Sequence, residues 1–95
     1  MIHKTAIVDS NAKISKNVKI GENSIIAGQA GIAGSSIIGK NVKIGGQAGI
    51  SGHLNIGNNV EIGGGSGVVR NIPDNTKVMG YPAKNIREFL RDNKW

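Results

Sequence analysis

Residues 28–52 read GQAGIAGSSIIGKNVKIGGQAGISG, so a glycine-rich phrase at residues 28–34 returns eighteen residues later with one letter changed. The phrase belongs to a shorter period, because every sixth residue from Ile2 to Val68 is Ile or Val. A period of six does not fit the 3.6-residue turn of an α-helix. It predicts short β-segments separated by turns, each pointing one aliphatic side chain inward.

A second set of small or aliphatic residues stands two positions before these aliphatics, as Ala30 does before Ile32 and Ala48 before Ile50. Alternate residues of a strand share a side, so both sets face inward. The pattern resembles that of hexapeptide-repeat proteins, which wind left-handed with three hexads to a coil. The resemblance implies an all-β fold, a left-handed parallel β-helix of about four coils spaced by ~4.8 Å.

The repeat fades after Ile72, where residues 73–75 read as a turn. Residues 77–80 are consistent with a short extended piece, and Pro82 is suited to a helix start. Ile86, Phe89 and Leu90 follow at helical spacing, which predicts a short α-helix over about residues 83–93. We therefore expect a β-helix domain at 1–72 and a C-terminal turn and amphipathic helix at 73–95.

The eighteen-residue offset equals one coil, so the two glycine-rich phrases stack on one face of the prism. Outward positions there are Gly31, Gly49 and Gly67, which let a backbone or a ligand approach closely. Other faces carry outward isoleucines such as Ile7 and Ile37, which indicate a subunit contact.

The composition limits which stabilising devices, partners and cellular locations are possible. The chain has 95 residues, 3% aromatic residues and no cysteine, so oligomerisation is the expected stabilising device. The net charge of +6 favours an acidic partner, but the basic residues are scattered and no aromatic platform for bases exists, which argues against nucleic acid. No apolar run is long enough for a membrane span and no signal peptide appears, so we expect a cytoplasmic protein.

Two histidines are too few for a metal site within one chain, and we expect none. His3 reads as a solvated residue near the N-terminus. His53 lies three positions past an inward aliphatic on the glycine-rich face. It should stand near a turn and be reachable by solutes.

Three stretches carry a more specific resemblance: AGQAGIAGS (27–35), IGGQAGISGHLNIG (44–57) and IPDNTKVMGYPAKNIREFLR (72–91). They resemble the C-terminal part of the UDP-3-O-(3-hydroxyacyl)glucosamine N-acyltransferases of lipid A biosynthesis. Residues 1–21 resemble the first coil of that family and of the related UDP-N-acetylglucosamine O-acyltransferases. The family's middle coils and N-terminal uridine-binding domain are missing from this sequence.

The resemblance implies a homotrimeric enzyme with active sites in clefts between prisms and no metal or other cofactor. A 3-hydroxyacyl group passes from acyl carrier protein to the amine of a UDP-amino-sugar. The family's oxyanion-binding glycine falls on Gly34, and its second active-site histidine falls on His53. The general-base histidine falls on Lys16, and lysine acts as a base only where burial or nearby positive charge favours its neutral form.

The resemblance also suggests that Lys84, Arg87 and Arg91, together with Lys94, steer the acidic carrier protein. The same side chains are equally consistent with a solvated outer face of the helix. Two further functions stay open at this point. One is a catalytically impaired scaffold that binds acyl chains or carrier protein without turnover, and the other is a small sugar acetyltransferase that uses acetyl-CoA.

Overall fold

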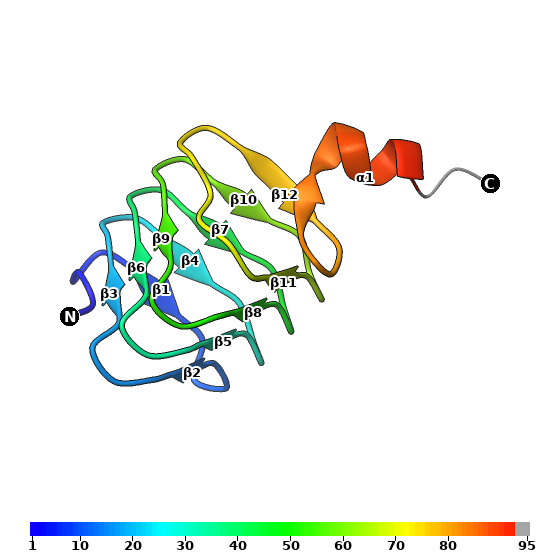
Figure 1. The fold of residues 1–95 in the computed structure, drawn as a ribbon. Helices are drawn as coiled ribbons and strands as arrows, with labels where there is room; N and C mark the ends of the chain where they lie inside the picture. Colours follow the sequence, from blue (N-terminus) through cyan, green and yellow to red (C-terminus); the bar gives the residue numbers. More distant parts are fainter. Residues whose placement is uncertain (93–95) are drawn as a thin grey trace.

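The computed structural model describes residues 1–92, which fold as a parallel β-helix with one short helix at the C-terminal end (Figure 1). Each coil contains three two-residue strands joined by turns. Strands one coil apart stack into three sheets, ordered β1-β4-β7-β10-β12-β13, β11-β8-β5-β2 and β3-β6-β9. The strands of the coils are β1 (Ile7–Val8), β2 (Lys13–Ile14), β3 (Lys19–Ile20), β4 (Ile25–Ile26), β5 (Gly31–Ile32), β6 (Ile37–Ile38), β7 (Lys43–Ile44), β8 (Gly49–Ile50), β9 (Asn55–Ile56), β10 (Glu61–Ile62) and β11 (Gly67–Val68).

The register explains the repeated phrase. Gly31 pairs with Gly49, and Gly49 pairs with Gly67, each partner eighteen residues along the chain. The second residue of each strand points inward, so Ile26, Ile32 and Ile38 are at most 2% exposed. Burying each such side chain contributes about 1.5–3 kcal/mol. The prediction of a parallel β-helix of about four coils with one short C-terminal helix is confirmed.

Two buried serines at small inward positions, Ser24 and Ser36, each donate one hydrogen bond and accept another. The Ser36 hydroxyl donates to the Ser51 carbonyl at 2.6 Å and accepts from the Leu54 amide at 3.1 Å. The Ser24 hydroxyl makes the same two bonds one face away, to Gly39 and from Val42. These hydroxyls therefore tie the start of a turn to the strand that follows it.

Most corners of the prism are four-residue turns whose third residue takes a left-handed conformation. The residues with positive φ at these positions are Asn17, Asn23, Gln29, Ser35, Asn41, Gln47, His53, Asn59, Gly65 and Asn75, with φ between 56° and 71°. A β-turn with positive φ at this position favours Gly or Asn. The frequent asparagines thus follow from backbone geometry, and His53 occupies one of these positions.

The C-terminal segment extends the stack and then folds back over it. Ile72 bridges to Ile56, and β12 (Lys77–Met79) pairs in parallel with β10, so the coil continues through this strand. β13 (Lys84–Asn85) then returns antiparallel to β12, and the helix α1 spans Ile86–Asp92. Of the predicted elements, the extended piece at 77–80 corresponds to β12.

The helix begins later than residue 83, because residues 84 and 85 are held as a strand against Met79 and Val78. Asn93 and Lys94 lie outside the described residues. No helix in residues 1–92 has the length and apolar character needed to cross a membrane.

Candidate functional site

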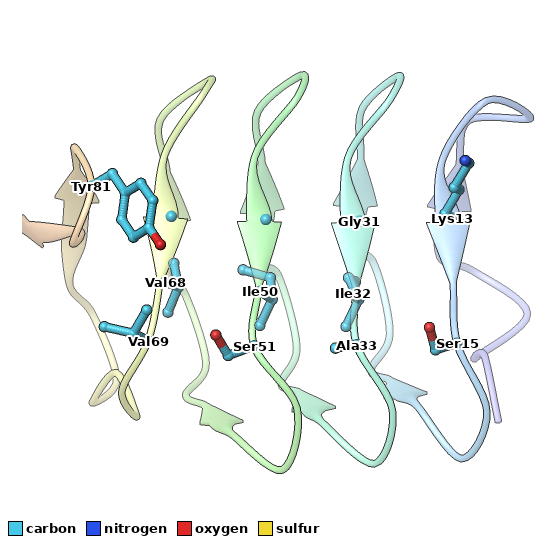
Figure 2. Close-up of a pocket in the computed structure, with 12 residues that line it drawn as sticks. Lys13, Ser15, Gly31, Ile32, Ala33, Ile50, Ser51, Val68, Val69 and Tyr81 are labelled. Atoms are coloured by element: carbon cyan, nitrogen blue, oxygen red, sulfur yellow. The ribbon is translucent and has the colours of Figure 1, made fainter.

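The glycine face is the outer surface of the sheet β11-β8-β5-β2, and it carries a shallow groove of about 460 Å³. Its floor is bare, because an ideal Cβ built on Gly31 or Gly49 would meet no atom within 4 Å. Figure 2 shows Lys13 and Tyr81 at opposite ends of the groove. Ser15, Ala33, Ser51 and Val69 form a row along one edge. The prediction that this face admits close approach fits this shape.

Tyr81 closes the C-terminal end of the groove, and sequence reasoning gave it no such place. A Cβ built on Gly67 would lie 2.8 Å from Tyr81 Cδ1, so the ring covers that glycine. Tyr81 as a residue is nevertheless 81% exposed. In the sequence, Pro82 indicates only a helix start, and no local pattern indicates that the chain returns to place Tyr81 over Gly67.

The row of edge residues leads into one corner of the prism, which we call the site corner (residues 15–17, 33–35, 51–53 and 69–71). It brings together the three candidate residues Lys16, Gly34 and His53 on successive coils. Ser35 N–H donates to the Lys16 carbonyl at 3.0 Å, and His53 N–H donates to the Gly34 carbonyl at 3.0 Å. Residues dispersed over 38 positions of sequence thus become vertical neighbours.

The Gly34 N–H has no recorded acceptor within residues 1–92, like the corresponding amides of Gly28 and Gly46 but unlike the Lys40 and Asn58 amides. At the asparagine corner (residues 21–23, 39–41, 57–59 and 73–75), Lys40 N–H donates to Asn58 Oδ1 at 2.9 Å. Gly52 takes the place of that capping side chain above Gly34. A Cβ built on Gly52 would lie 4.0 Å from Gly34 N, so the unfilled side-chain position is beside this amide.

A second difference keeps the site corner uncapped. At the asparagine corner the residue before Lys40 is Gly39, and a Cβ built there would lie 2.5 Å from Asn58 Oδ1. The cap therefore requires glycine at that position, and the site corner has Ala33 instead. An oxygen atom of a bound molecule is not tethered to the next coil, so it can approach Gly34 N–H from other directions.

His53 is exposed and stands at the turn, as the sequence predicted. Its φ of 60° suits histidine, which is enriched in the left-handed region among non-glycine residues. Within the described chain only its backbone amide has a recorded hydrogen bond, so the imidazole is available to a ligand. The turn position alone explains a polar residue here, while the free imidazole permits proton transfer.

Lys16 is also exposed, and it forms no ion pair within residues 1–92. Burial is one of the conditions under which lysine acts as a base, and it is absent here. An exposed lysine is solvated and carries its positive charge. This environment supports an anion-binding role better than a proton-accepting one.

The candidate carrier-protein residues are spread over two elements. Lys84 lies on β13 and pairs with Asp92 at 2.6 Å; this hydrogen bond raises the pKa of Lys84 and lowers the pKa of Asp92. Arg91 Nε lies 3.8 Å from the same carboxylate. Arg87 is exposed on α1 without an ion pair in the described part of the chain. No group of three or more His, Asp or Glu side chains in residues 1–92 is placed to hold a metal ion.

Residues 1–34 match the bacterial transferase hexapeptide (six repeats) family. Among solved structures, the chain is similar to serine acetyltransferase from Neisseria gonorrhoeae in complex with serine, at 32% identity and TM-score 0.69, covering 87% of this chain and 40% of that one. It is also similar to soybean serine acetyltransferase, at 27% identity and TM-score 0.70, covering 88% and 41%. No curated protein matches the chain.

The acetyltransferase domain of PglB from Neisseria gonorrhoeae, in complex with acetyl coenzyme A, has TM-score 0.61 at 24% identity, which bears on the fold alone. That match covers 88% of this chain and 56% of the other, so the chain spans about half or less of these solved proteins. The stacked hexads and these matches together define a hexapeptide acyltransferase-like fold.

Proposed function

We propose that the chain is an acyltransferase that moves a (3-hydroxy)acyl group from a thioester donor to the amine of a UDP-amino-sugar. The observation that carries this proposal is the uncapped N–H of Gly34 on the coil next to His53. Two turns at the asparagine corner fill the equivalent position with a side-chain oxygen, as Asn58 does for Lys40 and Asp74 does for Asn58. A hydrogen-bond donor left open beside a free imidazole is suited to acyl transfer.

In the proposed reaction the amine nitrogen bonds to the thioester carbonyl carbon, and the C–S bond breaks to release the thiol. Negative charge develops on the carbonyl oxygen, where Gly34 N–H stabilises it. The amine must lose a proton, and the His53 imidazole accepts it. The same proton then neutralises the leaving thiolate, so the histidine is regenerated.

The groove on the glycine face is the proposed seat of the acyl chain, because it is bare, apolar and continuous with the site corner. The proposed active form is a homotrimer, in which a neighbouring prism supplies the second wall of this open groove. Exposed apolar residues on the other faces support such contacts; Ile7 is 65% exposed and Ile37 is 43% exposed. The proposed donor is acyl carrier protein, with Arg87 and Arg91 as cationic contacts, in the cytoplasm.

One observation favours a second candidate. Lys16 stands where the resembling family has its general base, and its exposure argues against that role. The chain would then be a trimeric scaffold that binds acyl chains or carrier protein without turnover. Activity that appears only in Lys16→His would establish this alternative.

The test is an acyl-transfer assay with UDP-amino-sugar and either acyl carrier protein or acetyl-CoA as the donor. His53→Asn keeps a residue that tolerates positive φ and removes the imidazole, so we expect a fall of about 10²–10⁴-fold. Gln47→Asn, at the same turn position of another corner, is the matched control. A failure to transfer from any donor would overturn the proposed function, and transfer from acetyl-CoA alone would favour the small acetyltransferase.

A further inference from the structure

The site corner is the part of the prism where positive charge is not balanced. All six acidic residues lie elsewhere: Glu22 and Asp74 at the asparagine corner, Asp9 at the third corner, Glu61 on the face that carries Ile7, and Glu88 and Asp92 on α1. Lys13, Lys16, Lys19 and Arg70 flank the site corner. None of these four has an ion pair within the described residues.

Two of these cations lie at the site corner, in the coils on either side of the site glycines. Lys16, Gly34 and Gly52 occupy the same turn position on three successive coils, as their backbone bonds indicate. Arg70 lies at this corner in the next coil, two residues after Val68, where the turn is two residues shorter because Ile72 pairs with Ile56. Lysine and arginine side chains are longer than the coil spacing of ~4.8 Å. Both cations can therefore reach over the bare surface that the two glycines leave between them.

The backbone adds a hydrogen-bond donor between the cations. The Gly52 N–H has no recorded acceptor in residues 1–92. Cationic side chains and turn N–H groups together are the groups that bind phosphate in proteins. The third corner (residues 9–11, 27–29, 45–47 and 63–65) also has glycines at this turn position, but it has Asp9 and no cation.

We propose that Lys16, Arg70 and the Gly52 N–H bind the diphosphate group of a nucleotide-sugar. This inference rests on the proposed function for the identity of the acceptor. In a 2-amino-sugar 1-diphosphate the amine and the phosphate ester are on adjacent ring carbons, so they are separated by about one coil spacing. An amine placed at Gly34 and His53 thus brings its diphosphate within reach of both cations, and Lys16 acts as a positioning residue through charge.

The test is a titration of backbone amide resonances in the full chain with inorganic pyrophosphate, UDP and, separately, coenzyme A. We expect pyrophosphate and UDP to shift the Gly52 amide saturably and to leave Gly28 and Gly46 at the third corner unmoved. Lys16→Gln and Arg70→Gln should each weaken binding about tenfold, as for a charge-assisted hydrogen bond. Lys40→Gln, which removes a cation paired with Glu22, is the matched control.

Two results would overturn the inference: no shift at Gly52 with pyrophosphate or UDP, or equal shifts at Gly28 and Gly46. Binding of coenzyme A at the corner without UDP would overturn the assignment to the acceptor, because the phosphate would then come from the donor. UDP binding in a chain that transfers no acyl group would support the diphosphate site while the proposed function fails. If the chain is active, Lys16→Gln and Arg70→Gln should raise the KM for the acceptor. An unchanged KM in both variants would contradict the proposed diphosphate site.

Discussion

The asparagine corner and the site corner have the same backbone and opposite side-chain chemistry. At the asparagine corner, Asn41, Asn59 and Asn75 hydrogen-bond to one another from coil to coil, and Asn58 and Asp74 cap the amides of Lys40 and Asn58. At the site corner, glycines and a free imidazole stand at the corresponding positions. The comparison indicates that the prism needs no specific side chain at this corner, so residues there are available for ligands.

Among changes that test the difference between the two corners, building the missing cap into the site corner should have the largest effect. The double variant Ala33→Gly with Gly52→Asn recreates the arrangement of Gly39 and Asn58, so a side-chain oxygen would occupy Gly34 N–H. We expect kcat for acyl transfer to fall about 10²–10³-fold relative to Ala33→Gly alone, the usual effect of losing one oxyanion donor. Equal rates in the two variants would contradict a role for this amide.

The buried serines behind the two corners should contribute equally to stability, because both make the same pair of hydrogen bonds. Ser24→Ala and Ser36→Ala each leave an amide and a carbonyl without their hydroxyl partner. We expect each to lower the free energy of unfolding by about 1–3 kcal/mol, measured by denaturant titration. A loss of stability in only one of the two variants would show that the corners differ in structure and not only in surface chemistry.

Removal of a cap should have a smaller effect and should be confined to the asparagine corner. Asn58→Gly frees the Lys40 amide and interrupts no strand pairing. We expect a loss of about 1 kcal/mol of stability, typical of a capping side chain, with acyl transfer retained. Loss of activity in this variant would mean that the two corners are not independent.

The ion pair at the C-terminal end should have the smallest effect, since both side chains are exposed to solvent. The lowered pKa of Asp92 means that its contribution is present above the ordinary pKa of a carboxyl group and is lost as the pH falls through the lowered value. The raised pKa of Lys84 gives a contribution that is lost only in strong alkali. Asp92→Asn should therefore lower the melting temperature slightly at pH 7 and not at pH 2.

The sequence predicted the fold well because the period of six decides which side chains are buried. Ile32 and Ile50 point inward because they fall on the six-residue period. Their register follows from the eighteen-residue offset between them. The helix start was less predictable, because β13 forms by pairing with β12, a contact that no local pattern encodes. The place of Tyr81 over Gly67 also depends on the return of the chain after residue 80.

The candidate site could be predicted only in part. The resemblance pointed to Lys16, Gly34 and His53, and the structure places all three at one corner. The uncapped state of Gly34 N–H could not be inferred from those residues. It depends on the methyl group that Ala33 has and Gly39 lacks, and on the side-chain oxygen that Asn58 has and Gly52 lacks. Their roles in catalysis stay a proposal.

The most direct test of the central claim is amide hydrogen exchange at Gly34 and Lys40, measured residue by residue in the full chain. The account predicts that the capped Lys40 N–H exchanges about fivefold more slowly or slower still, relative to each residue's intrinsic rate, as expected for ~1 kcal/mol of hydrogen bonding. It also predicts slow exchange at Gly34 once the double variant supplies a cap. Equal protection of the two amides in the unmodified chain would contradict the claim that the site corner offers an open donor.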